Sequence, residues 1–228
     1  MISFLQSKNL SHFSNLEHGF LKKDQALSPS PYFLHQIHSN KIITLTSLPS
    51  TPIDADGMVT NTPHIALGLK TADCVPVLLF DPEANVIGAL HAGWKGARLD
   101  ICKNCITEME KLGAKRHRIL AALGPSIAQE SYEVGPEFRK DFLEESSAND
   151  VFFIPTSKKD HFLFDLKGYV IRKLQEEKIL NPEILPFNTY TSTHLFHSYR
   201  KATHEGLTSQ KDYNPEKKPN NISFIKLK

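Results

Sequence analysis

Residues 71–98, TADCVPVLLFDPEANVIGALHAGWKGAR, constrain the fold of this chain more than any other stretch. Two short apolar runs, Val75–Phe80 and Val86–Leu90, flank the turn-forming residues 81–85, DPEAN. Apolar runs separated by a few Pro, Asn and Asp residues are typical of paired antiparallel strands. The stretch therefore predicts a β-hairpin.

The register of this hairpin brings two reactive side chains together. If Asp81 pairs with Val86 across a four-residue loop, antiparallel pairing places Pro76 opposite His91. Cys74 shares the face of Pro76, because side chains alternate along a strand. Diagonal partners have Cβ atoms about 7 Å apart, so Cys74 and His91 are expected at one end of the hairpin, close enough to share a bound atom.

Composition sets the size of the core and excludes one class of partner. A chain of 228 residues, 40% of them hydrophobic, can bury a large core, and the even composition predicts one domain over residues 1–228. The formal charge is only +2, from 27 basic and 25 acidic residues, which argues against a nucleic-acid partner.

The sequence also indicates a compartment. The first 20 residues lack the basic flank and apolar run of a signal peptide, and no stretch approaches the roughly 18 apolar residues of a membrane span. The three cysteines, an odd number, argue against a disulfide framework. These features predict a cytoplasmic protein without a membrane partner and leave its oligomeric state open.

The order of the apolar patterns predicts an α/β fold. Strand-like runs recur along the chain, at Lys41–Leu45, Ile65–Leu69, Val75–Phe80, Val86–Leu90, Arg118–Leu123, Phe162–Asp165 and Ile222–Leu227. Strands that arrive as hairpins with helices between them favour layers with mixed sheets over a strict βαβ repeat.

Two helices and one loop are expected between these strands. Gly96–Leu112 has apolar residues every three to four positions and is followed by Gly113, a helix stop. Leu166–Glu177 shows a similar pattern, with Asp165 as its N-cap. The polar segment Lys211–Asn221 is expected as an exposed loop before the last strand.

Histidines upstream of the hairpin extend the reactive cluster. His35 and His38, in LHQIHSN, precede a strand-like run whose end can meet the hairpin in a packed sheet. Two histidines and the Cys74 thiolate would leave a fourth position open, which is the pattern of a catalytic zinc site. The alternative is that each is a separate core or surface residue.

The pair Cys102 and Cys105, in CKNC, invites a redox or metal interpretation. Both lie inside the predicted helix, with Cys105 on its apolar face, whereas a thioredoxin-like pair lies at a helix N-terminus after a strand. We therefore expect both cysteines to be structural.

Two segments suit an anionic or polar ligand. HAGWKGAR, residues 91–98, turns into a helix whose first N–H groups can hold an anion, with Lys95 and Arg98 adding positive charge. Alternatively, its glycines merely allow a tight turn. Residues 188–201 combine hydroxyls, two histidines and Arg200, which suits either a polar ligand or an ordinary polar strand.

Three aspartates, Asp54, Asp56 and Asp73, lie near these histidines and Cys74 in the sequence. They are candidates to orient the ligating histidines as hydrogen-bond acceptors. The commoner use of such residues is in turns and caps.

Seven motifs follow one another across nearly the whole chain: QIHS at 36–39, DADGMVTN at 54–61, TADCVPVLLFD at 71–81, GALHAGWKGA at 88–97, LGPSIAQESYEVG at 123–135, FDL at 164–166 and FHSYR at 196–200. In this order the chain resembles the YfiH family, also called the multicopper polyphenol oxidase or laccase-domain family, which includes purine nucleoside phosphorylases. The combination of TADC with HAGW is highly specific.

The resemblance implies a four-layer α/β/β/α arrangement and a zinc site. Its ligands, which are then also the catalytic residues, are the histidine of QxH, the cysteine of TADC and the histidine of HAGW, here His38, Cys74 and His91. His35 has no counterpart in the motif. The family's older name makes copper the alternative metal.

Family members are similar to enzymes that phosphorolyse adenosine, inosine and methylthioadenosine and that deaminate adenosine, so purine nucleosides and phosphate are the expected partners. An open zinc position suits deamination, because zinc lowers the pKa of its water to about 7. Phosphate is expected at the HAGWKG turn beside Lys95 and Arg98, and Arg200 is expected to bind substrate or phosphate as well.

The chain departs from the family in two places. Asn188-Thr189-Tyr190 stands where a Cys-Thr-Tyr stretch is usual, and RKATHEGLTSQKDY replaces the expected RRDG and GR tail. The three ligand motifs are intact, so these departures bear on substrate range rather than on metal binding.

Three other functions compete with this one. A cysteine hydrolase would use Cys74 as nucleophile and His38 or His91 as base, and metal content separates it from a zinc enzyme. A copper-dependent polyphenol oxidase would need histidines in clustered pairs, and the 11 histidines include no HxH pair. A quality-control role in peptidoglycan composition is the third.

Overall fold

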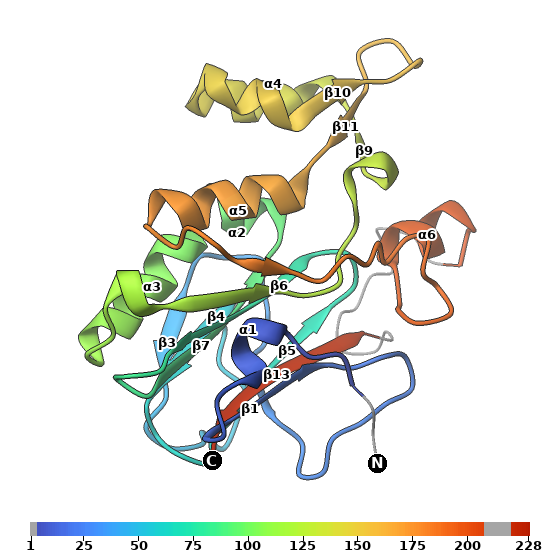
Figure 1. Ribbon diagram of the computed structural model, residues 1–228. Helices are drawn as coiled ribbons and strands as arrows, with labels where there is room; N and C mark the ends of the chain where they lie inside the picture. Colours follow the sequence, from blue (N-terminus) through green and yellow to red (C-terminus); the bar gives the residue numbers. More distant parts are fainter. Residues whose placement is uncertain (1–3, 208–219) are drawn as a thin grey trace.

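The centre of the molecule is a six-stranded sheet with strand order β12-β8-β6-β7-β4-β3 (Figure 1). The structure is a computed structural model that describes residues 4–207 and 220–228. Its strands are β3 (Ile42–Thr44), β4 (Gly57–Thr60), β6 (Val75–Asp81), β7 (Val86–Ala92), β8 (Leu120–Leu123) and β12 (Glu183–Ile184). β12 is parallel to β8 and β3 to β4, and the other neighbours are antiparallel. The sheet is therefore mixed, as predicted.

The hairpin β6–β7 has the predicted register. Asp81 pairs with Val86 and Pro76 with His91, so strand β7 extends past the predicted end to include His91. The Asp81 carboxylate accepts hydrogen bonds from the backbone N–H groups of Glu83 and Ala84 and closes the turn. Every residue of both strands is buried, which requires that both faces of the sheet are covered.

A four-stranded sheet covers one of these faces. Its order is β1-β13-β5-β2, with β1 (Leu16–Phe20), β2 (Tyr32–Phe33), β5 (Ala66–Thr71) and β13 (Asn221–Leu227). Leu78 and Phe80 of β6 pack into the core between the two sheets. Val77 and Leu79, on the alternate face of β6, pack into a second core beneath helices.

The helices over that second core are α2 (Trp94–Arg98), α3 (Ile101–Lys111) and α5 (Leu166–Glu176). The prediction of one continuous helix over Gly96–Leu112 is wrong, because Asp100 adopts a left-handed backbone with a φ of 61° and separates α2 from α3. Asp165 caps α5 as predicted, accepting a hydrogen bond from the N–H of Gly168.

The upper part of the molecule in Figure 1 is built from residues between β8 and α5. It contains α4 (Pro136–Glu145), η3 (Ser147–Phe152) and a three-stranded antiparallel sheet of β9 (Glu133–Val134), β10 (Phe153–Pro155) and β11 (Phe162–Phe164). Phe138, Phe142 and Phe164 form a ring cluster that packs this part onto α5 through Tyr169. The other short helices in the described part of the chain are α1 (Lys8–Ser11), η1 (Arg116–Arg118), η2 (Gln129–Ser131) and α6 (Tyr199–His204).

The predicted α/β class with mixed sheets is confirmed. Helices α2, α3 and α5, the six-stranded sheet and the four-stranded sheet stack as successive layers. Within residues 4–207 and 220–228, no helix has the length and apolar character needed to cross a bilayer. Most of the predicted loop Lys211–Asn221 lies outside the described residues, and its last residue begins β13.

Candidate metal centre

Three potential ligands converge at the end of the β6–β7 hairpin. Cys74 lies just before β6, His91 lies near the end of β7, and His38 comes from the loop before β3. One nitrogen or sulfur atom from each lies within 4.8 Å of the others, and the two imidazole rings are 4.7 Å apart between centroids. Among the described residues, this is the group of His, Cys and acidic side chains that is suited to a metal ion.

Asp56 holds both histidines of this group. Its fully buried carboxylate accepts hydrogen bonds from His91 Nδ1 at 2.8 Å and from the backbone N–H of His38 at 2.9 Å. It also accepts from the N–H and the hydroxyl of Ser39, at 2.6 and 2.7 Å. Since Nδ1 of His91 is engaged by Asp56, Nε2 is the nitrogen left to face the ligand cluster.

The contacts of Asp56 also decide its charge. Burial alone would raise its pKa, but the hydrogen bonds and charge of His91, with the hydrogen bonds of Ser39, lower the pKa to about 2. Asp56 is therefore a carboxylate over the whole physiological pH range. The loop that it holds is strained, because His38 has a φ of 59°.

The two neighbouring histidines favour the thiolate form of Cys74. Burial opposes ionisation of its thiol, but the charges of His91 and His38 and their hydrogen bonds outweigh burial and lower the pKa of Cys74 to about 6. The thiolate and Asp56 in turn raise the pKa of His91 to about 10, against the effect of burial. At neutral pH the metal-free pair is therefore a thiolate facing an imidazolium, and His91 must release a proton to bind a metal, because a ligating imidazole is neutral.

The space around the three ligands is suited to a small ion. A Cβ atom added at Gly93 would lie 2.8 Å from His38 Nδ1 and 3.1 Å from Cys74 Sγ, so only glycine leaves this position open. One thiolate and two imidazoles form a donor set that zinc favours, with a fourth position left for water or substrate. The residues present therefore fit a zinc ion.

The ligands open into a cavity of about 900 Å³. One part of its wall is aromatic, from Trp94, Tyr132 and Phe138. The hydroxyl of Thr71, also in the wall, is buried and has no hydrogen-bond partner within the described part of the chain. The cavity thus combines flat apolar surface with polar groups, as pockets for small molecules do.

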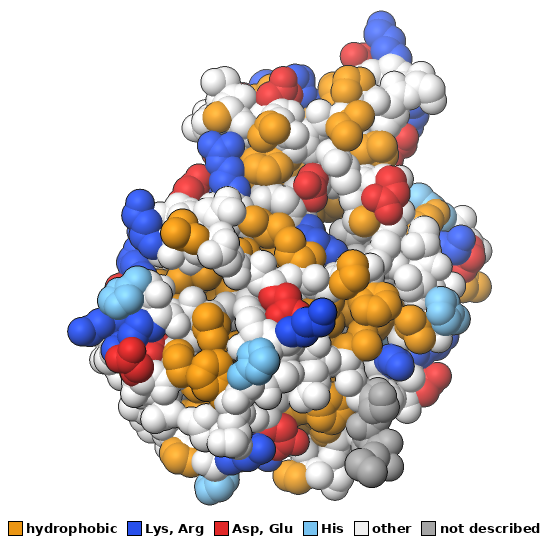
Figure 2. All heavy atoms as spheres, in the orientation of Figure 1, with side chains coloured by type: hydrophobic (Ala, Val, Ile, Leu, Met, Phe, Trp, Pro, Cys, Tyr) orange, Lys and Arg blue, Asp and Glu red, His pale blue; other side chains and the backbone are white. Residues whose placement is uncertain are grey.

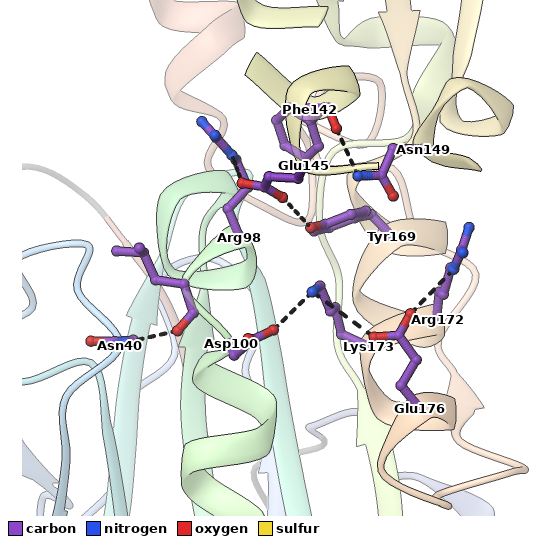
Figure 3. A network of polar contacts seen from close by, with 11 residues as sticks. Asn40, Arg98, Asp100, Phe142, Glu145, Asn149, Tyr169, Arg172, Lys173 and Glu176 are labelled. Carbon is purple, nitrogen blue, oxygen red and sulfur yellow. Dashed lines mark hydrogen bonds and ion pairs between the residues drawn. The ribbon is translucent and has the colours of Figure 1, made fainter. Parts of the chain in front are cut away.

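Two of the three cations predicted to bind substrate or phosphate line this cavity, and one does not. Lys95 and Arg200 are in its wall, and the guanidinium of Arg200 lies 5.0 Å from the centre of the Tyr132 ring. Arg98 instead forms an ion pair with Glu145 at 2.5 Å (Figure 3). It forms a second ion pair with Asp141 at 3.3 Å. Arg98 therefore joins α2 to α4 and does not reach the cavity.

The structure also separates the roles of the three aspartates. Asp56 bonds to His91, a candidate ligand, which agrees with one of the two interpretations. Asp54 bonds to His35 at 2.7 Å, outside the ligand group. Asp73 is buried among hydrogen-bond donors of residues 189–200, and burial raises its pKa in spite of those bonds. The position of Asp56 between two histidines is visible only in three dimensions.

Residues 188–201 do not form the polar strand that was one of the two interpretations. They make a series of turns that leads into α6, whose N-cap Ser198 accepts from the N–H of Lys201. Thr189 is fully buried, and Arg200 reaches the cavity. The ligand-binding interpretation of this segment remains a proposal.

Cys102 and Cys105 are both buried in α3, at a distance from the ligand group in the fold. Burial raises the pKa of Cys102 to about 12 and raises that of Cys105 as well. Both are neutral thiols at physiological pH, which agrees with the structural role predicted for them. Cys102 is more buried than the helical pattern suggested.

Residues 17–209 match the family described as "Multi-copper polyphenol oxidoreductase laccase". A protein of Rickettsia conorii named "Purine nucleoside phosphorylase" is 35% identical over 209 residues, which cover 84% of this chain and 86% of that protein. A protein of an unknown prokaryotic organism named as an adenosine deaminase is 45% identical over 87 residues, 38% of this chain and 33% of its own length.

Solved structures agree with the fold. The crystal structure of a Bacillus licheniformis protein, titled as the hypothetical protein YfiH, superposes with a TM-score of 0.83 at 22% sequence identity. The superposition covers 100% of this chain and 97% of that one. At this level of identity the likeness concerns the arrangement of the backbone.

Proposed function

Because the chain belongs to the multi-copper polyphenol oxidoreductase laccase family, the YfiH family of the sequence motifs, we propose that it is a zinc-dependent purine nucleoside phosphorylase that also deaminates adenosine. The proposed substrates are adenosine, inosine and methylthioadenosine, with phosphate as co-substrate. The observation that carries the proposal is that His38, Cys74 and His91 open into a cavity that also holds Lys95 and Arg200.

His38, Cys74 and His91 would hold the metal, and Asp56 would keep His91 in the tautomer that presents Nε2. Zinc, when bound there, supplies a Lewis acid that lowers the pKa of a coordinated water to about 7. Asp56 carries no proton itself, since its pKa is about 2. Its part is to fix the direction and basicity of the imidazole.

In phosphorolysis, a phosphate oxygen forms a bond to C1′ of the ribose while the bond from C1′ to the purine nitrogen breaks and the base takes up a proton. Lys95 and Arg200 would bind the phosphate and offset its charge, because both are cations in the cavity wall. Trp94, Tyr132 and Phe138 provide aromatic surface on which a purine can stack. The buried hydroxyl of Thr71 is available to hydrogen-bond the nucleoside.

Deamination replaces the amino group at C6 of adenosine by oxygen from water and releases ammonia. It needs the metal ligands and the nucleoside, but no phosphate. The two reactions therefore share His38, Cys74 and His91 and differ in their need for cations. Replacing Lys95 should therefore separate phosphorolysis, which needs a cation for phosphate, from deamination, which does not.

A cysteine hydrolase is the second candidate, and one observation favours it. The Cys74 thiol has a pKa of about 6 and faces His91, which is the arrangement of a nucleophile with its base. A metal-bound thiolate alkylates slowly, whereas a free thiolate of low pKa alkylates quickly. Elemental analysis of the purified protein and the iodoacetamide rate at Cys74 separate the two, and the analysis also distinguishes zinc from copper.

The decisive experiment is a nucleoside panel on zinc-loaded protein, with and without phosphate. We expect adenine and ribose 1-phosphate from adenosine with phosphate, and some inosine without it. Cys74→Ala should abolish both products. Lys95→Ala should raise the KM for phosphate roughly tenfold and spare deamination, since one charged contact to phosphate is lost. Lys103→Ala, an exposed lysine on α3 outside the cavity wall, is the matched control.

If zinc-loaded protein leaves adenosine, inosine and methylthioadenosine unchanged in the presence of phosphate, the proposed function is wrong. We further propose that residues 1–228 act as one domain, since β1 and β13 from the two ends of the chain pair in one sheet. The three free cysteines support a reducing, cytoplasmic setting.

A further inference from the structure

Asp73 lies directly before the ligand Cys74 and has an unusual backbone. Its φ is 90°, in the region that favours glycine, and only 8% of its surface is exposed. Its carbonyl oxygen accepts a hydrogen bond from the N–H of Ile127 at 2.9 Å. A residue with a side chain keeps such a conformation only where the surrounding contacts hold it there.

The carboxylate of Asp73 reaches the C-terminal part of the chain. One oxygen accepts from the hydroxyl of Thr189 at 2.6 Å, and the other accepts from the backbone N–H of Arg200 at 2.7 Å. Thr189 is fully buried, so its hydroxyl has no water to replace this bond. These contacts span 116 and 127 residues of sequence.

The bond to Arg200 satisfies a backbone N–H group in the first turn of helix α6. N–H groups in the first turn of a helix have no partner within the helix. Ser198 satisfies that of Lys201, and Asp73 satisfies that of Arg200 from a different part of the fold. Helix α6 is only six residues long, so such contacts, rather than its own hydrogen bonds, decide where it lies.

The placement of α6 decides what faces the cavity. Arg200, Thr203 and His204 of this helix all line it. Residues three and four apart lie on one face of a helix, so a single attachment near Arg200 orients all three. Asp73, which makes this attachment, is the residue directly before Cys74, one of the three proposed metal ligands.

We propose that Asp73 is a positioning residue, which holds helix α6 against the metal-ligand loop so that the guanidinium of Arg200 is presented to phosphate in the cavity. Asp73 itself does not touch the substrate and acts through Arg200. The proposal rests on the proposed phosphorolysis. Its structural part, the attachment of α6, is measurable without any turnover.

The attachment is tested by hydrogen exchange on the metal-loaded protein. Asp73→Asn and Thr189→Val should each raise the exchange rate of the Arg200 amide at least tenfold, with Asp73→Asn the larger. Thr60→Val is the matched control, since Thr60 is also fully buried and donates a bond of 2.6 Å, to the Leu45 carbonyl. It should leave the Arg200 amide unchanged. Thr189→Ser should restore protection.

The functional part is tested by kinetics. Asp73→Asn and Thr189→Val should raise the KM for phosphate by roughly 10- to 100-fold, the range of one lost contact to a charged group, with kcat within about threefold. In an Arg200→Ala background, Asp73→Asn should raise that KM no further, because the two residues act in series. Zinc content should remain stoichiometric in Thr189→Val, which does not alter a neighbour of Cys74.

The outcomes are distinct. Unchanged exchange at the Arg200 amide overturns the attachment, and faster exchange with an unchanged phosphate KM overturns the positioning role. Additive effects of Asp73→Asn and Arg200→Ala also contradict it. If the wild-type protein phosphorolyses no nucleoside, the proposed function fails, and calorimetric binding of inorganic phosphate replaces KM. Equal phosphate affinity of wild type and Thr189→Val would then overturn the positioning role.

Discussion

Replacing Asp56 by Asn tests the structural basis of the proposed metal centre most directly. The buried Asp56 carboxylate accepts hydrogen bonds from His91, His38 and Ser39. An Asn side chain has one acceptor oxygen, and its NH₂ group would face donors on the other side. At least one buried donor loses its partner and the buried His91 loses its counter-charge, so we expect a loss of about 3–5 kcal/mol in the free energy of unfolding.

The same substitution should weaken metal binding. His91 loses the carboxylate that orients its ring and raises its basicity, and losses of this kind lower metal affinity by about 10- to 100-fold. Competition against a chromogenic chelator measures the zinc Kd, and urea unfolding of metal-free protein measures the stability. Asp54→Asn is the control, because Asp54 is two residues away and bonds to the half-exposed His35, outside the group of three candidate ligands.

The dependence of the unfolding free energy on pH below 4 gives a second estimate of what Asp56 contributes to stability. The pKa of Asp56 falls from 3.8 to about 2 on folding, so its contribution is complete above pH 4 and is lost as the pH falls towards 2. A shift of this size corresponds to about 2 kcal/mol. The stability difference between wild type and Asp56→Asn should shrink by this amount over that window. A zinc Kd within twofold of wild type, with equal stability at pH 7, would refute the reasoning.

Three further substitutions have defined outcomes. Gly93→Ala should raise the zinc Kd more than tenfold by chelator competition, because the new Cβ would crowd His38 and Cys74, and unchanged affinity would show that the ligands lie elsewhere. Cys102→Ser with Cys105→Ser should keep zinc and turnover but lose about 1–3 kcal/mol in urea unfolding, since two hydroxyls are buried; loss of zinc would contradict this. Arg98→Ala should lower stability by about 1 kcal/mol and leave the phosphate KM within twofold, as its charge is already paired, and a large KM effect would return it to the phosphate site.

Local patterns in the sequence predicted the hairpin and its register correctly. Apolar runs on either side of a turn sequence have essentially one way to pair, and a slip of one residue would turn Pro76 and His91 to different faces. Helix α5 and its cap at Asp165 were also predicted, because the signal is local. The break at Asp100 was missed, since the apolar spacing continues through it and only the left-handed φ interrupts the helix.

Several short strands and helices were not predicted from the sequence. Strands such as β2, β9 and β12 have two residues each, too few to show a period. They exist because neighbouring strands offer them hydrogen bonds. Helix α6 was likewise not predicted, since it depends on Ser198 and Asp73 for its first turn.

The α/β class, the hairpin and its two reactive residues could be predicted from the sequence, since they follow from side-chain periodicity and turn chemistry over short spans. The bonds by which Asp56 joins His38 to His91, and the ion pair that holds Arg98 to α4, arise only when distant segments pack together. The same holds for the bond between Asp73 and Arg200, 127 residues further along the chain. The partner of a charged side chain depends on which groups the packed layers bring close to it. The neighbouring residues in the sequence carry no pattern that predicts this partner.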